Sequence, residues 1–248
     1  MTSSISSARW ELREALRNRA FFKWTVRNAP GRRVRWGNLR RKMPFSETFG
    51  WDRGTPVDRL YIEGFLAGHA DDIAGRVLEV KDSRYTERFG AGNAITPTVV
   101  DVDPDNSQAT ILADLCDPDC LPAEAFDCFI LVQTLQLLAD PFTAIDNAWN
   151  ALAPGGVLLI TVPTVTRSSR WGQDYWRWTP EGLKVFLGRQ LPDAITEVEG
   201  YGSLVTCTAF LLGIAQEELH PDELHERDKV FTLIASARVQ KPATATTG

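Results

Sequence analysis

Polar side chains directly follow several apolar runs in the middle of this 248-residue chain. Glu79 lies in VLEV, Asp101 and Asp103 in VVDVD, Asp114 in TILAD, and Gln133 follows FILV. Short apolar runs separated by helix-length segments predict a parallel sheet that is buried on both faces. In such sheets a ligand binds beyond the carboxyl ends of the strands. The spacing therefore predicts one ligand site lined by these carboxylates and this amide.

A second group of chemically useful side chains lies in the segment RWGQDYWRWTPEGL, and comprises Trp171, Asp174, Tyr175, Trp176, Arg177 and Trp178. Aromatic faces suit the C–H surfaces of a sugar ring, and charged groups suit its hydroxyls. The structural alternative is a lid or hydrophobic anchor, with Thr179 capping a helix ahead of Pro180. Asp174 and Tyr175 are the better candidates for a site, and Trp178 for an anchor.

The elements that must position these groups alternate along the chain. We expect a helix at 56–68, strands at 76–80, 98–102, 129–132 and 157–162, and a further pair of strands at 195–201 and 229–239. The stretch from Phe126 to Pro163 gives a strand, a helix, a Pro-Gly-Gly turn and a second strand. This order predicts a doubly wound, mostly parallel α/β fold.

Charge is distributed unevenly. Residues 1–42 carry 12 of the 27 Lys and Arg residues against two Glu, a local net charge of +10 in a chain of net −5. Apolar residues recur every four positions there, at Leu12, Leu16, Ala20 and Trp24. They predict an amphipathic basic helix that packs on the main domain, contacts a protein partner or second copy, or lies on an anionic membrane surface. A nucleic-acid partner is not indicated, because no binding motif accompanies the basic residues.

Length and composition indicate one α/β domain. We expect a basic helical extension at 1–45, the main domain at 46–240 and a disordered tail at 241–248. The absence of a long apolar run or signal-peptide core predicts a cytoplasmic protein. Buried free thiols are expected at all four cysteines, Cys116, Cys120, Cys128 and Cys207.

The order of these motifs resembles that of class I S-adenosylmethionine-dependent methyltransferases over about residues 46–187, most specifically in APGGVLLITVP. The segments FGWDRGTPVDRLYIEGFL and DYWRWTPEGL resemble flanking motifs of bacterial members linked to polysaccharide or glycan assembly. The resemblance implies a Rossmann-like domain with S-adenosylmethionine as cofactor. It also implies a hydroxyl of a sugar or oligosaccharide as the acceptor.

The resemblance further implies roles for individual residues. Asp103 would accept hydrogen bonds from the ribose hydroxyls, with Asp101 as the close competitor. Asp114 would bind the adenine amino group beside Leu115. Gln133 would approach the methionine part.

Glu79, Asp82 and Tyr85 would lie on the other side of the methionine part, and Tyr61 could cover its end. The segment Lys81–Ser83 departs from the family, because glycines are expected there. Two interpretations stay open: a loop that binds the cofactor through Asp82 or Tyr85, or a non-catalytic partner or scaffold protein that has lost cofactor binding. An NAD dehydrogenase is disfavoured, because no G-x-G-x-x-G follows the first strand. The charged residues of the first flanking motif would form ion pairs or line the cofactor mouth: Asp52, Arg53, Asp58 and Arg59.

A hydroxyl acceptor calls for a general base. Leu137 stands where many relatives have a histidine, and His220 and His225 lie in an acidic stretch typical of a solvated loop rather than a metal site. Asp174 is therefore the first candidate for the base, with Tyr175 and His69 completing the candidate catalytic set. His69 is also typical of a capping residue, and loss of the proton to water is the alternative to a base.

Overall fold

The computed structural model describes residues 37–90, 94–169 and 173–243. The chain divides into two units, residues 1–42 and 43–248. In the first unit the described part is a short 3-10 helix, η1 (Gly37–Leu39), and the three exposed basic residues after it. The basic helix predicted within residues 9–27 lies outside the described residues, as does Trp171.

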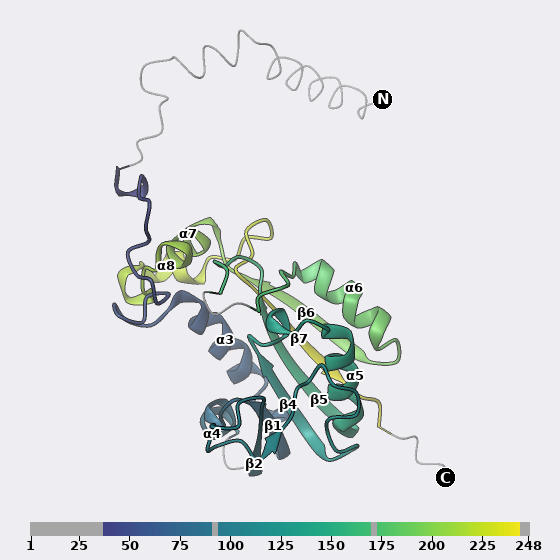
Figure 1. The fold of residues 1–248 in the computed structure, drawn as a ribbon. Helices are drawn as coiled ribbons and strands as arrows, with labels where there is room; N and C mark the ends of the chain where they lie inside the picture. Colours follow the sequence, from purple (N-terminus) through teal and green to yellow (C-terminus); the bar gives the residue numbers. More distant parts are fainter. Residues whose placement is uncertain (1–36, 91–93, 170–172, 244–248) are drawn as a thin grey trace, which may run out of the picture. The chain divides into compact units, whose positions relative to one another are not determined.

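The second unit is built around a seven-stranded sheet with the order β3-β2-β1-β4-β5-β7-β6 (Figure 1). Its strands are β1 (Gly75–Val80), β2 (Ala94–Asp101), β3 (Ile111–Leu112), β4 (Phe126–Val132), β5 (Leu152–Pro163), β6 (Ile195–Tyr201) and β7 (Ile234–Gln240). The first five run parallel, and β7 pairs antiparallel with both β5 and β6. The predicted doubly wound, mostly parallel α/β fold is confirmed.

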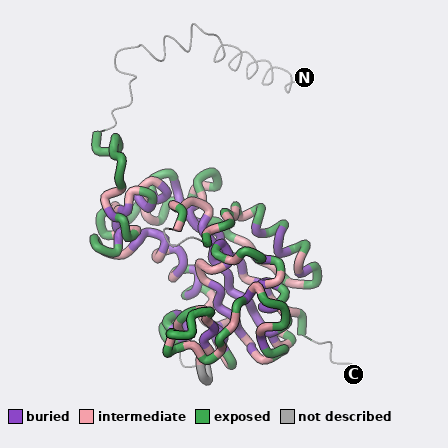
Figure 2. Tube along the Cα trace, viewed as in Figure 1, coloured by how far each residue is buried: buried purple, intermediate pink, exposed green. Residues whose placement is uncertain are grey.

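Helices cover both faces of this sheet (Figure 1). They are α3 (Val57–Gly68), α4 (Arg84–Phe89), α5 (Pro141–Ala151), α6 (Pro180–Gln190), α7 (Leu204–Leu212) and α8 (Pro221–His225), with 3-10 turns η2 (Ala70–Asp72), η3 (Leu135–Leu137) and η4 (Gln216–Glu218). Apolar residues of α5 and α6 share one core cluster with one face of the strands, and those of α3 and α7 share a second cluster with the other face. The central strands are accordingly buried (Figure 2), which explains their nearly continuous apolar sequences.

Two helices on the first face begin with side-chain caps. The Asp140 carboxylate accepts from the backbone N–H groups of Phe142 and Thr143 at 3.1 and 3.2 Å, where α5 begins. Thr179 accepts from Gly182 N at 3.0 Å, and Pro180 occupies the first turn of α6. The prediction that Thr179 caps a helix is thus confirmed.

Four parts of the sheet differ from expectation. Strand β2 begins at Ala94 rather than residue 98, and β5 begins at Leu152, so the predicted Pro-Gly-Gly turn lies within the strand. Strand β3 was not predicted, because it has two residues and Leu112 is 62% exposed. Strand β7 begins at Ile234 rather than near Lys229, because a turn intervenes in which Val230 N donates to the Asp228 carboxylate at 2.8 Å.

All four cysteines are free thiols; Cys128 and Cys207 are buried, whereas Cys116 and Cys120 are half-buried. The chain is still fixed just after β7, since Lys241 Nζ donates to the Leu152 carbonyl at 2.7 Å. Among the described residues, no helix has both the length and the apolar character needed to cross a bilayer.

Candidate functional site

A cavity of about 750 Å³ opens at the carboxyl ends of β1, β2 and β4. The strand order reverses between β1 and β4, and this switch point is where α/β sheets bind ligands. The volume lies within the range of small-molecule sites. Its lining comes from the last residues of these strands and the loops after them, from α3 and α4, and from Gln173 and Tyr175 of the later aromatic segment.

Carboxylates line the β2 and β3 side of the cavity. Asp101 ends β2; its Oδ1 accepts from Val102 N at 2.7 Å and its Oδ2 accepts from the Asn106 amide at 2.6 Å. Asp114 is exposed at the cavity wall and accepts from Cys116 N at 2.8 Å. The buried side chain of Leu115 contributes an apolar surface next to it.

Asp103, the first choice for ribose binding, lies outside the cavity lining. It is exposed on the turn beyond the strand, and its Oδ1 accepts from Asp105 N at 3.0 Å. Because β2 ends at Asp101, that residue is the one of the pair that reaches the cavity. The structure therefore favours Asp101, the close competitor, over Asp103.

Glu79 lies in the cavity wall, but its carboxylate accepts hydrogen bonds from the first turn of α4. Its Oε1 accepts from Tyr85 N at 3.1 Å, and its Oε2 accepts from Thr86 N and Thr86 Oγ1 at 2.8 and 2.7 Å. Burial raises the pKa of Glu79, and these hydrogen bonds act against the rise. The carboxylate thereby fixes the start of α4 to β1.

The loop between Glu79 and α4 has one residue in a backbone conformation that favours glycine. Lys81 has φ +76°, in the left-handed region that favours glycine, and Ser83 has φ −99°. Asp82 lines the cavity and its carboxylate accepts from Arg84 N and Arg84 Nη2, both at 3.1 Å. Of the three residues that stand where glycines are expected, Lys81 thus adopts a backbone conformation that favours glycine.

Tyr85 and Arg59 meet in the wall next to this loop. Arg59 Nη1 donates to the Tyr85 hydroxyl at 2.5 Å, and Arg59 Nη2 lies 3.3 Å from Asp58 Oδ2. Burial alone would lower the pKa of Arg59, but Asp58 and Tyr85 raise it. Arg59 and Tyr85 line the cavity, as expected for a role at the cofactor mouth.

The remaining charged pair of the same motif is structural. Asp52 accepts hydrogen bonds from Ser46 and Thr48, and Arg53 Nε donates to Glu218 at 2.9 Å. These contacts fasten the segment before α3 to η4. Of the two roles left open for this motif, Arg53 forms an ion pair, whereas Arg59 lines the cavity and its role at the cofactor mouth stays a prediction.

The β4 side of the cavity is joined to the aromatic segment. The backbone carbonyl of Gln136 accepts from Tyr175 N at 2.9 Å and from Trp176 N at 3.2 Å. Gln133 and Leu137 line the wall there, and Tyr175 stands at its rim with its side chain 54% exposed. Tyr175 and Gln133 are therefore placed to contact a bound ligand.

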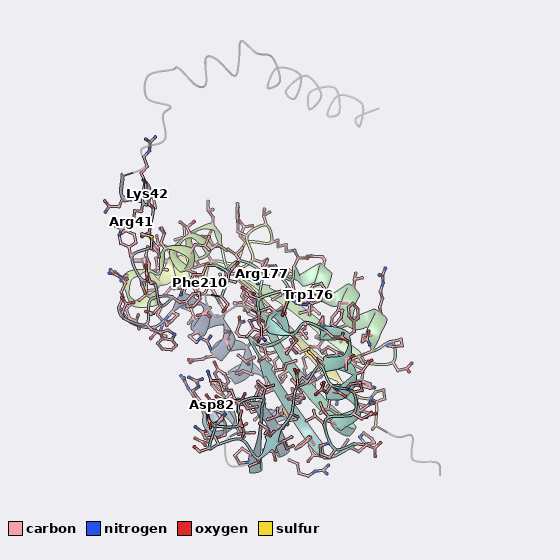
Figure 3. The ribbon with its side chains drawn as sticks, in the orientation of Figure 1. Arg41, Lys42, Asp82, Trp176, Arg177 and Phe210 are labelled. Carbon is pink, nitrogen blue, oxygen red and sulfur yellow. The ribbon has the colours of Figure 1, made fainter. Side chains whose placement is uncertain are left out.

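Asp174 does not line the cavity. Arg177, which adjoins Trp176 in Figure 3, donates to both of its carboxylate oxygens, and Ser169 N donates at 2.8 Å. The side chain is 8% exposed, and the Arg177 hydrogen bonds lower its pKa. A paired carboxylate with a lowered pKa is a poor general base, so the structure does not support Asp174 in that role.

The tryptophans after Asp174 anchor the segment. Trp176 Nε1 donates to the Leu138 carbonyl at 2.9 Å, and the Trp178 ring lies 4.7 Å from that of Phe186 in α6. Trp178 thus packs against the core, as the anchor interpretation requires.

Tyr61 and His69 also lie away from the cavity. Tyr61 is on the face of α3 that packs on Tyr201, and its hydroxyl donates to the Leu224 carbonyl at 2.9 Å. His69 follows the far end of α3, about 15 Å along the helix from Arg59 at 1.5 Å per residue, beside Phe65 and Asp72. Neither position supports the predicted cofactor or catalytic role.

A sequence model of the methyltransferase domain family matches residues 78–160, the span from β1 to β5 that carries most of the cavity. The search of curated proteins found no match.

Solved structures share the fold at low sequence identity. A SAM-dependent methyltransferase from Archaeoglobus fulgidus is 12% identical over 74% of this chain and 94% of its own, with a TM-score of 0.52. The [4+2]-cyclase SpnF is 20% identical over 77% and 85%, with a TM-score of 0.51. A chain of the complex between the Haloferax volcanii Trm112 methyltransferase activator and a putative methyltransferase is 16% identical over 75% and 92%, with a TM-score of 0.50.

The sheet order and these comparisons show the Rossmann-like methyltransferase fold. The match over residues 78–160 also supports S-adenosylmethionine as the cofactor of this domain. The presence of a cyclase among the similar structures illustrates that such a fold does not by itself determine the reaction.

Proposed function

We propose that the protein transfers the methyl group of S-adenosylmethionine to a hydroxyl of a sugar or glycan intermediate. The observation that carries the proposal is the cavity at the β1/β4 switch point, with Asp101 and Asp114 in its wall. The acceptor class is supported by the resemblance of the two flanking motifs to those of glycan-assembly methyltransferases.

The lining fits the parts of this cofactor. Asp101 and Asp114 offer carboxylates for the ribose hydroxyls and the adenine amino group, and Leu115 offers an apolar surface for the ring. Arg59, Lys81 and Arg84 line the same cavity and offer positive charge for a carboxylate.

Bound S-adenosylmethionine would supply an electrophilic methyl group. The chain's own part is then to orient the acceptor hydroxyl in line with that group. Tyr175 at the rim and Gln133 in the wall are placed to orient the acceptor. No histidine occurs among the described lining residues, so we infer catalysis by positioning, with the acceptor proton passing to water.

A second candidate function is a non-catalytic partner or scaffold protein with this fold. It is favoured by the loop Lys81–Ser83, which lacks the expected glycines. The similar Haloferax volcanii complex contains a methyltransferase and an activator, which makes a protein partner reasonable for this chain as well. A cytoplasmic location, a homodimer and a peripheral contact through the basic N-terminal segment stay predictions.

Isothermal titration with S-adenosylmethionine and S-adenosylhomocysteine tests the first function against the second. Binding of either ligand, followed by transfer of labelled methyl to members of an oligosaccharide panel, would support the enzyme. No binding of either at millimolar concentration would overturn the enzyme and leave the partner protein.

A further inference from the structure

A hydrogen-bonded pair of side chains forms part of the cavity wall. It consists of Arg59 from α3 and Tyr85 from α4, joined by the 2.5 Å hydrogen bond from guanidinium to hydroxyl. The Arg59 side chain is 20% exposed, and that of Tyr85 is buried. The two residues come from different helices, so they fix a defined point in the wall.

Most backbone N–H groups near this pair already donate hydrogen bonds within the protein. The N–H groups of Tyr85 and Thr86 both donate to the Glu79 carboxylate. The Arg84 N–H donates to Asp82 at 3.1 Å, and the Lys81 N–H to the Val100 carbonyl at 2.9 Å. These four N–H groups are therefore not available to an anion, which leaves side chains as the main source of recognition at this point of the wall.

The Tyr85 hydroxyl has a hydrogen to give. Its oxygen accepts from Arg59, and the described residues provide it with no hydrogen-bond acceptor. Burial raises the pKa of Tyr85, so the hydroxyl is protonated at neutral pH. The adjacent guanidinium polarises the O–H group and makes it a stronger donor.

Arg59 adds charge at the same point. Asp58 contacts only Nη2, at 3.3 Å, and its carboxylate does not line the cavity. Lys81 also lines the cavity, whereas Arg84 and Asp82 pair with each other and Glu79 is engaged with α4. The Tyr85 hydroxyl and the Arg59 guanidinium thus offer a donor and a positive charge at one point of the wall.

We propose that Tyr85 and Arg59 form a subsite for the α-carboxylate of the cofactor's amino-acid part, with side chains replacing a glycine-rich backbone loop. This inference rests on the proposed function, because it assumes that S-adenosylmethionine binds in the cavity. It makes Tyr85 and Arg59 determinants of which adenosyl ligands bind.

The test compares S-adenosylhomocysteine with S-adenosyl-3-thiopropylamine, which lacks only the carboxylate, by isothermal titration. Tyr85→Phe removes one hydroxyl and is expected to weaken S-adenosylhomocysteine binding roughly tenfold or more. The same variant should change binding of the decarboxylated analogue less than about twofold. Arg59→Lys, which keeps the charge beside Asp58 and loses the planar fork, should show the same selectivity.

Tyr61→Phe is the matched control, because Tyr61 lies on the same helix as Arg59 and its hydroxyl bonds to the Leu224 carbonyl away from the cavity. It should leave both affinities unchanged. Equal loss of both ligands in Tyr85→Phe, or no loss of either, would overturn the subsite while leaving the proposed function in place. Failure of the wild-type protein to bind either ligand would overturn the proposed function itself.

Discussion

Arg177 donates hydrogen bonds to both carboxylate oxygens of Asp174, three residues before it. Asp174 was the first candidate for the general base, and this ion pair gives its carboxylate a structural role beside the cavity. It holds the chain where Tyr175 and Trp176 bond to Gln136, so it shapes the rim of the site.

Asp174→Asn should therefore lower stability in a pH-dependent way. Because the folded-state pKa of Asp174 is lowered, its contribution is present above the unfolded pKa of about 4 and is lost as the pH falls through the folded value. Urea unfolding of wild type and variant should give a difference at pH 7 that shrinks below about pH 4. A difference of the same size at pH 3 and pH 7 would contradict this account.

Substitutions of the two aspartates at the end of β2 should have different effects on cofactor affinity. Asp101→Asn places an N–H₂ group among donors and removes a charge from the cavity wall, so we expect at least a roughly tenfold loss of S-adenosylhomocysteine affinity. Asp103→Asn is the matched control and should change affinity less than about twofold. Titration calorimetry distinguishes them, and the opposite order would restore Asp103 as the ribose ligand.

Lys81→Gly should stabilise the protein. A residue with a side chain at φ +76° costs about 1 kcal/mol of folding free energy, and glycine removes this cost. Glycine also raises the entropy of the unfolded chain, which offsets part of the gain. Lys81→Ala is the control, since it removes the same charge and keeps the unfavourable backbone conformation. If both variants shift the urea midpoint equally, backbone conformation is not the cause.

Glu79→Gln should destabilise the protein by about 1–3 kcal/mol, because an amide cannot accept at both positions from the donors on Tyr85 and Thr86. Glu63→Gln, which breaks the more exposed pair with Arg88, should cost less than about 1 kcal/mol. Chemical unfolding of both variants at pH 7 measures the contrast. If the two variants lose the same free energy of unfolding, the contact between Glu79 and α4 contributes little to stability.

Much of the fold could be predicted from the sequence because its central strands are buried on both faces and therefore apolar throughout. The cavity could be located in general terms, since polar residues end these strands. The choice between Asp101 and Asp103 could not be made, because it depends on the residue at which β2 ends. The sequence also could not show whether Tyr61 faces the cavity or the core, since tyrosine occurs on either face of a helix that packs on a sheet.

Some residues of the site gave no usable signal in the sequence. Cys116 lines the cavity, although its sequence context indicated only a buried thiol, whereas Arg84 falls within residues 81–85, which were expected near the methionine part. The Asp174–Arg177 pair gave no signal either, because residues three apart are neighbours on a helix, and residues 173–179 form no helix.

The position of β7 between β5 and β6 governs how the sheet can assemble. Strand β6 pairs only with β7, so residues 195–201 stay without a sheet partner until the later residues 234–240 join them. The same segment must also align with residues 157–163, across a long sequence separation that slows folding. During synthesis the parallel half can form first, whereas the last edge closes only after β7 has been made.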